Sequence, residues 1–60
     1  MVYEKVNEIC KERGISLATV EKEAGLSNGA ICKWKYSSPK VSSVQAVAKV
    51  LKVKVSKLIE

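Results

Sequence analysis

The side chains that most often carry out catalysis are scarce in this chain of 60 residues. It contains no histidine and no aspartate, so neither a Ser/His/Asp nor a Cys/His arrangement can be assembled. The two cysteines, Cys10 and Cys32, are too few for a four-ligand zinc site, and we expect both to be free thiols. The sequence therefore predicts a protein that is not an enzyme and that uses no cofactor, metal or small-molecule ligand.

Side chains suited to a polyanion are better represented. The amide of Asn28 can pair with adenine, and the ammonium of Lys33 can donate to the O6 and N7 atoms of guanine. The net charge is +5, and residues 33–60 hold seven lysines against one glutamate, whereas residues 1–32 hold four basic and five acidic residues. This asymmetry favours nucleic acid as a partner, with an anionic membrane second, although charge alone leaves a solvated lysine surface equally open.

The spacing of apolar residues predicts five helices that would position these side chains. The first covers residues 2–13 and ends at Gly14, because glycine easily adopts the left-handed conformation that follows a helix end. The second covers about residues 16–24, with Ser16 as N-cap and a turn at Gly25.

The third predicted helix, residues 27–35, begins with a serine as N-cap and would carry both candidate base contacts. Ile31 and Trp34 would face the core from it. Asn28 and Gly29 also form a hairpin signal, but the flanking residues do not alternate between apolar and polar, which favours the helix.

Two further helices are predicted beyond the loop that contains Pro39, one from residue 41 or 42 to residue 51 and one over residues 55–59. The last helix offers Val55, Leu58 and Ile59 as a candidate homodimer surface. The same three side chains could instead close the core.

Two short helices joined by a tight turn have the spacing of a helix-turn-helix. The residues that carry a wider match are Leu17-Ala18-Thr19-Val20, Gly25, Leu26-Ser27, Ile31, Trp34, Pro39-Lys40-Val41, Val44, Val47-Ala48-Lys49-Val50-Leu51, Val53 and Leu58-Ile59. Through them the chain resembles the phage repressor and Cro-type family (XRE-like, lambda-repressor-like) over residues 6–59.

The resemblance implies a compact all-α domain of five helices over residues 1–60. It implies a transcriptional regulator, typically a repressor, that binds double-stranded DNA sequence-specifically with the third helix in the major groove, often as a two-fold dimer on a palindromic operator. We expect a cytoplasmic protein of a bacterium or a phage-infected cell, without a membrane partner, because no apolar run approaches the roughly 18 to 20 residues that span a bilayer.

The predicted contacts with DNA fall into two groups. Asn28, Gly29 and Lys33 are the candidate base contacts, with Gly29 allowing close approach rather than specifying a base. The candidate contacts with the DNA backbone open the predicted helices or follow the third one. They are Ser16, Ser27, Lys35, Tyr36, Ser37, Ser38, Lys40, Ser42 and Ser43.

The chain also departs from the family pattern. Leu17 stands where the family often has a glutamine that contacts phosphate, and Glu21 stands where a small residue usually lets the two helices approach. We expect Glu21 to point toward solvent or to pair with a lysine. Lys40, Lys52 and Lys54 replace a capping residue, a glycine and a second cap, which predicts weakly capped ends for the last two helices.

A different class of function remains open. The chain could be a protein-interaction module, such as an antitoxin-like or phage regulatory partner-binding domain, that uses apolar residues of the last helix. A cationic peptide that folds only on a membrane surface is a third alternative, which the predicted caps and the distributed core disfavour.

Overall fold

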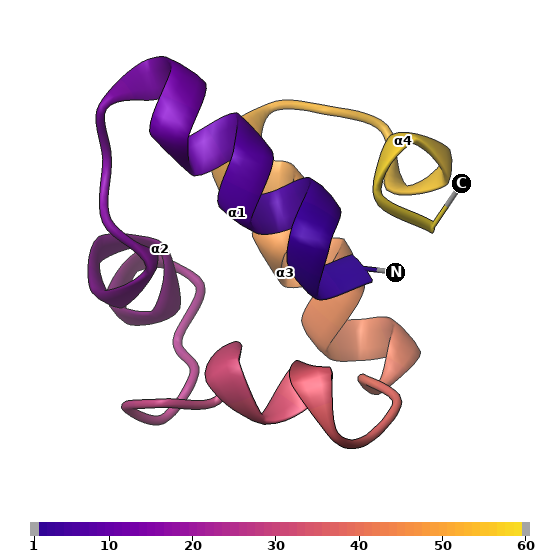
Figure 1. Cartoon of the computed structure of the whole chain (residues 1–60). Helices are drawn as coiled ribbons and strands as arrows, with labels where there is room; N and C mark the ends of the chain where they lie inside the picture. Colours follow the sequence, from indigo (N-terminus) through magenta and orange to yellow (C-terminus); the bar gives the residue numbers. More distant parts are fainter. Residues whose placement is uncertain (1, 60) are drawn as a thin grey trace.

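The computed structural model describes residues 2–59; Met1 and Glu60, the end residues of the expected 1–60 domain, lie outside them. Every regular element within residues 2–59 is a helix (Figure 1), so the prediction of an all-α chain is confirmed. The expected five α-helices are not found there, because the third element is a short 3-10 helix. The elements are α1 (Val2–Arg13), α2 (Leu17–Glu23), η1 (Cys32–Lys35, the 3-10 helix), α3 (Val41–Leu51) and α4 (Val55–Ile59).

The first two helices end and begin where local sequence signals place them. Gly14 follows α1 with a φ of 68°, in the left-handed region that favours glycine. Ser16 caps α2, and its hydroxyl oxygen accepts a hydrogen bond from the backbone N–H of Thr19 at 3.2 Å. Gly25, with a φ of 75°, lets the chain reverse after α2.

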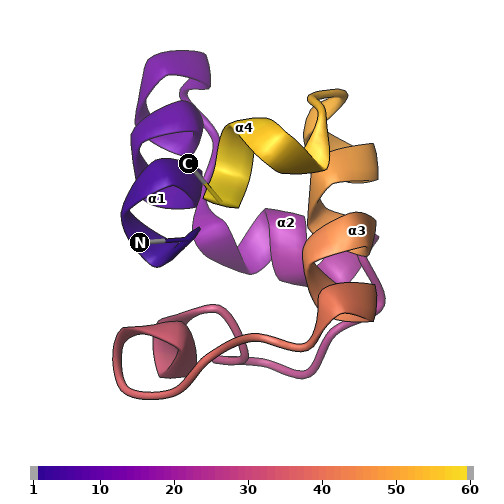
Figure 2. The same cartoon turned by 90° about the vertical axis from the view of Figure 1, so that its right-hand side faces the viewer.

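The helices pack around a shared apolar core. Figure 2 shows α1 and α3 as two upright helices with α2 and α4 between them, and α1 contacts α4 and η1 while α3 contacts α2 and α4. No helix within residues 2–59 is long and apolar enough to cross a membrane. The buried apolar residues are Val6, Cys10, Val20, Ile31, Trp34, Val44, Val47, Ala48, Leu51 and Leu58.

The two ends of α3 differ in how their backbone groups are satisfied. Lys40 is the N-cap, and its side chain makes no capping hydrogen bond. Lys52 is the C-cap with a φ of 58°, so a lysine adopts a conformation that favours glycine. The guanidinium of Arg13, at the end of α1, donates a hydrogen bond to the carbonyl oxygen of Leu51. This contact satisfies one of the free carbonyls at the end of α3 and places a positive charge at the negative end of the helix.

Candidate nucleic-acid interface

The segment after Gly25 does not form the continuous α-helix that was predicted for residues 27–35. Residues 28–31 form turns, and only Cys32–Lys35 is helical, as the 3-10 helix η1. The N–H of Ala30 donates to the carbonyl of Ser27, and that of Trp34 to the carbonyl of Ile31, both at 3.0 Å and both three residues back along the chain. The expected N-cap at Ser27 was therefore wrong, since Ile31 precedes the helix.

The carboxylate of Glu21 explains this conformation. The Glu21 side chain is only 4% exposed, so the expectation that it would point to solvent or pair with a lysine was wrong. Its Oε1 accepts a hydrogen bond from the N–H of Gly29 at 3.0 Å, and its Oε2 accepts one from the N–H of Ile31 at 2.9 Å. In an α-helix begun at Ser27, the Ile31 N–H would instead donate to the carbonyl of Ser27. Glu21 therefore takes the place of a helical hydrogen bond.

Gly29 is a second reason why this segment is not an α-helix, and it acts locally. Its φ of 85° lies outside the helical region, which interrupts any helix through residues 28–31. The Asn28-Gly29 pair thus forms a turn, as its composition favours, but neither a hairpin nor the start of an α-helix follows it. The turn signal of Asn28-Gly29 and the helical spacing of the apolar residues are both local, and neither indicates that the carboxylate of Glu21 binds this turn.

The three candidate base contacts lie on different parts of this segment. Asn28 is exposed in the turn, and Lys33 is exposed on η1. Gly29 is half-buried and its N–H already binds Glu21. Ile31 is fully buried and Trp34 is 7% exposed, so the opposite side of the segment anchors it to the core as predicted.

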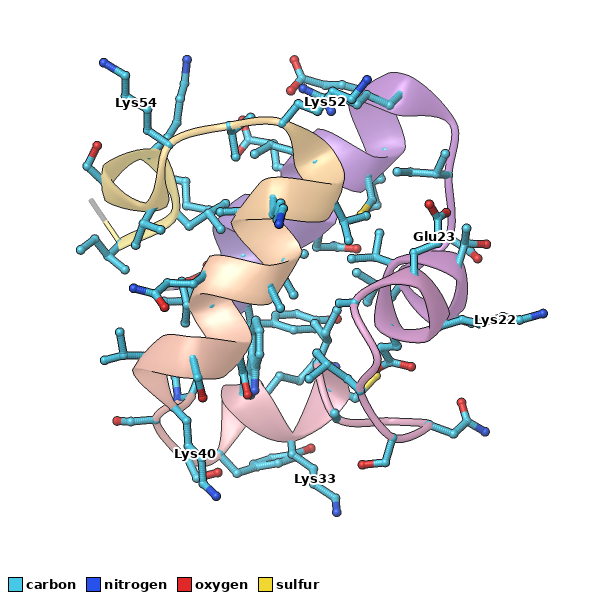
Figure 3. All side chains as sticks on the ribbon, turned by 180° about the vertical axis from the view of Figure 1, so that it is seen from behind. Lys22, Glu23, Lys33, Lys40, Lys52 and Lys54 are labelled. Atoms are coloured by element: carbon cyan, nitrogen blue, oxygen red, sulfur yellow. The ribbon has the colours of Figure 1, made fainter. Side chains whose placement is uncertain are left out.

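Lysines of the basic half do not form one patch. Figure 3 shows Lys33 and Lys40 at one end of the molecule and Lys52 and Lys54 at the opposite end. The end with Lys33 also carries the turn of residues 28–31, whereas the other end carries the loop between α3 and α4. Only part of the positive charge can therefore face a partner that contacts Asn28.

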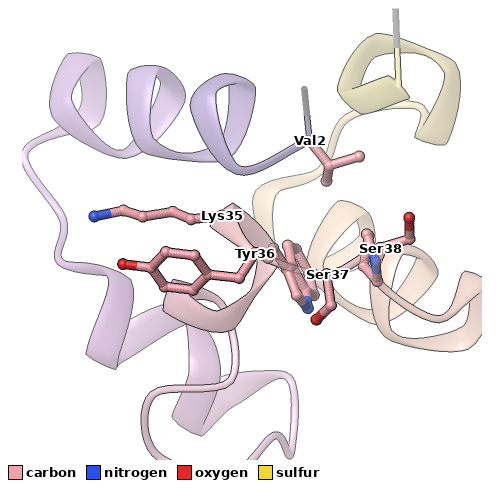
Figure 4. A pocket seen from close by; sticks show the side chains of 7 residues that line it. Val2, Lys35, Tyr36, Ser37 and Ser38 are labelled. Atoms are coloured by element: carbon pink, nitrogen blue, oxygen red, sulfur yellow. The ribbon is translucent and has the colours of Figure 1, made fainter.

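The side chains of residues 35–38, at the end of η1 and after it, are exposed, although some of them already have a partner within the chain. Tyr36 is 89% exposed, and Lys35 places its Nζ over the ring of Tyr3 on α1, 4.9 Å from the ring centroid. The hydroxyl of Ser37 donates to the carbonyl of Lys33 at 3.3 Å. A shallow pocket of about 290 Å³ lies beside these residues (Figure 4). It is lined by Val2, Trp34, Lys35, Tyr36, Ser37, Ser38 and Pro39.

The remaining candidate contacts lie near the starts of α2 and α3 and before the turn of residues 28–31. The hydroxyl of Ser16 is engaged as a cap and lies 2.9 Å from the hydroxyl of Thr19. Ser27 is exposed before the turn, and near the start of α3 Ser42 is exposed while Ser43 is half-buried. The structure therefore places these groups on several elements rather than in one row.

The candidate dimer surface on α4 is divided. Leu58 is fully buried, so its assignment to a surface was wrong; its side chain closes the core instead. Ile59 is 60% exposed and Val55 is half-buried. A five-residue helix with one face in the core buries the side chains on that face and exposes those on the other.

The two thiols have different environments. Cys10 lies in the core, where burial raises its pKa more than the nearby charge of Arg13 lowers it. Cys32 is exposed at the start of η1, and both thiols are free.

Comparison with protein-family models, with curated proteins and with solved structures gives no match to this chain. Its role is therefore proposed from its own residues.

Proposed function

We propose that this chain is a helix-turn-helix domain of the phage repressor and Cro type, with a lambda-repressor-like arrangement of helices. In this proposal it binds double-stranded DNA sequence-specifically and regulates transcription as a repressor. One observation carries the proposal: Ile31 and Trp34 hold the segment after Gly25 against the core, while Asn28 and Lys33 of the same segment remain exposed. A recognition element in the major groove needs both features: apolar side chains that fix it to the core and exposed polar side chains that can reach the base edges.

The recognition element proposed here is shorter than a standard recognition helix. It consists of the turn of residues 28–31 and η1, and it has two polar side chains for base contacts, Asn28 and Lys33. Lys40 and the exposed serines near it supply contacts with phosphates, which position the domain without specifying sequence. Affinity in this arrangement comes mainly from the phosphates, and it falls as salt concentration rises.

The wider biological setting belongs to the same proposal. A two-fold dimer on a palindromic operator would use the exposed Ile59 and the half-buried Val55 of α4, without Leu58. The domain would act in the cytoplasm of a bacterium or of a phage-infected cell.

Selection of duplexes from a random pool by gel shift, at two salt concentrations, tests this function. We expect an enriched sequence and a dissociation constant that rises with salt by a log–log slope of about 0.9 per neutralised phosphate. Asn28→Ala should weaken binding to the enriched duplex by about 1–3 kcal/mol. Enrichment of no sequence, together with no salt-dependent binding, would contradict the proposal.

A matched pair of lysine substitutions locates the interface. Lys33→Ala and Lys54→Ala each remove one positive charge from an exposed side chain, but at opposite ends of the molecule. We expect Lys33→Ala to weaken binding to the enriched duplex and Lys54→Ala to change it little. Equal losses would mean that net charge, not a defined face, determines binding.

A further inference from the structure

Glu21 is the one buried charged side chain within residues 2–59. Burying a carboxylate is unfavourable unless hydrogen bonds replace its hydration. Its two oxygens accept from the backbone N–H groups of Gly29 and Ile31, at 3.0 and 2.9 Å. Hydrogen bonds to a charged acceptor are stronger than those between neutral groups, so this contact holds the turn tightly.

The same residue holds the segment at a third point. The backbone carbonyl of Glu21 accepts a hydrogen bond from the N–H of Leu26 at 2.8 Å. Three amides, one before the turn of residues 28–31 and two within it, are therefore bound to a single residue of α2. Asn28 lies between the first two of these amides along the chain, and Lys33 follows two residues after the last.

We propose that Glu21 is a positioning residue for DNA recognition, because its carboxylate sets the directions in which Asn28 and Lys33 leave the surface. The inference rests on the function proposed above and adds a residue that itself makes no contact with DNA. The expected change in DNA affinity has the opposite sign to that of an ordinary charge substitution. Neutralising an acidic residue close to DNA ordinarily strengthens binding through charge, whereas neutralising Glu21 weakens binding through geometry.

Glu21→Gln and Glu23→Gln form the decisive pair of variants. Both remove one negative charge from α2, but Glu23 is exposed, whereas Glu21 is buried. Glutamine has one acceptor oxygen, and its NH₂ group would face an N–H donor. We expect Glu21→Gln to bind the selected duplex roughly tenfold more weakly, the loss expected when a base contact is misplaced.

The salt dependence separates positioning from a general structural defect. Phosphate contacts remain in Glu21→Gln, so the slope against salt and the affinity for unrelated duplexes should stay as in the wild type, while the specificity ratio falls. Glu23→Gln should bind the selected duplex at least as tightly as the wild type. If Glu21→Gln binds it as tightly as Glu23→Gln does, the positioning role is overturned while the proposed function stands.

Two measurements keep the test decisive when Glu21→Gln folds poorly by circular dichroism. The first measures Glu21→Gln and Glu23→Gln again in a Lys52→Gly background. Glycine should stabilise the fold at this position because the φ of Lys52 is positive, and Lys52 lies at the end of the molecule opposite Lys33. The second follows amide exchange in the wild type, where Gly29 and Ile31 should exchange slowly; fast exchange would overturn the anchoring itself. A wild type that binds no duplex would overturn the proposed function and the positioning role with it.

Discussion

α3 and the segment of residues 26–35 have nearly the same length, but only α3 is a regular α-helix. In α3 the residues Val44, Val47 and Leu51 fall on one face and are buried, so the period of the apolar residues and the fold agree. In the segment of residues 26–35 the apolar period is also helical, yet two of its amides are bound by a carboxylate from α2. Periodicity therefore determines which side of a segment is buried, while a long-range hydrogen bond can determine its backbone conformation.

The largest expected effect is the loss of stability when a core side chain is truncated, because both regions are anchored in the core. Leu51→Ala in α3 and Ile31→Ala in the other segment each remove a fully buried side chain. We expect each to lower the free energy of unfolding by about 2–5 kcal/mol, a large part of the stability of a small domain. Urea unfolding followed by circular dichroism measures it. A loss below about 1 kcal/mol at Ile31 would show that this segment packs loosely.

A smaller effect should distinguish the two regions. Glu21→Gln removes one acceptor of the segment of residues 26–35 and leaves α3 untouched, so we expect a loss of about 1–3 kcal/mol in the free energy of unfolding. Glu23→Gln, on the exposed face of the same helix, should change it by less than about 0.5 kcal/mol. Equal losses in urea titrations of the two variants would mean that the buried carboxylate of Glu21 contributes no more to stability than the exposed one of Glu23.

The start of α3 should respond in the opposite direction. Lys40 has the extended conformation of an N-cap, with a φ of −72° and a ψ of 146°, but no capping side-chain bond. Lys40→Ser should stabilise the protein by about 1 kcal/mol, because serine can accept from the first free N–H groups of α3. The proposed function adds that it should weaken duplex binding. Thermal unfolding and gel shift on the same sample test both, and a variant that gains no stability contradicts the first.

The smallest expected effect is at the end of α3. Lys52→Gly should stabilise the protein by about 0.5–1 kcal/mol, because glycine adopts a positive φ without steric cost. Lys52→Ala is the control, because alanine removes the same lysine side chain but keeps the steric cost of a positive φ; Lys52 is the one residue other than glycine with a positive φ within residues 2–59. Only the first variant should raise the unfolding temperature.

Much of the fold was predictable because its signals are local. Gly14, Ser16 and Gly25 mark the end of α1 and the limits of α2, and the apolar spacing places α3 and α4. Each of these signals lies within a few residues of the feature it predicts. The burial of Trp34 followed from the same spacing and is confirmed.

The candidate site was less predictable because its geometry depends on distant residues. Glu21 was expected to point toward solvent or to pair with a lysine, and no local pattern indicates that its carboxylate binds the amides of Gly29 and Ile31. The separation of Lys33 from Lys54 likewise depends on where α3 and α4 fold back, not on their spacing in the sequence. Sequence left two interpretations open for α4, and the structure places Leu58 in the core.

Because only one of its two thiols is exposed, the unmodified chain offers a single site for chemical labelling. Cys10 is 2% exposed and its pKa is raised by burial, so it should stay protonated and unreactive in the folded protein. Cys32 is exposed and directly precedes Lys33 in η1. A maleimide dye should therefore attach to one position, next to the proposed recognition side chains. Fluorescence of that dye would follow the approach of a duplex without any substitution.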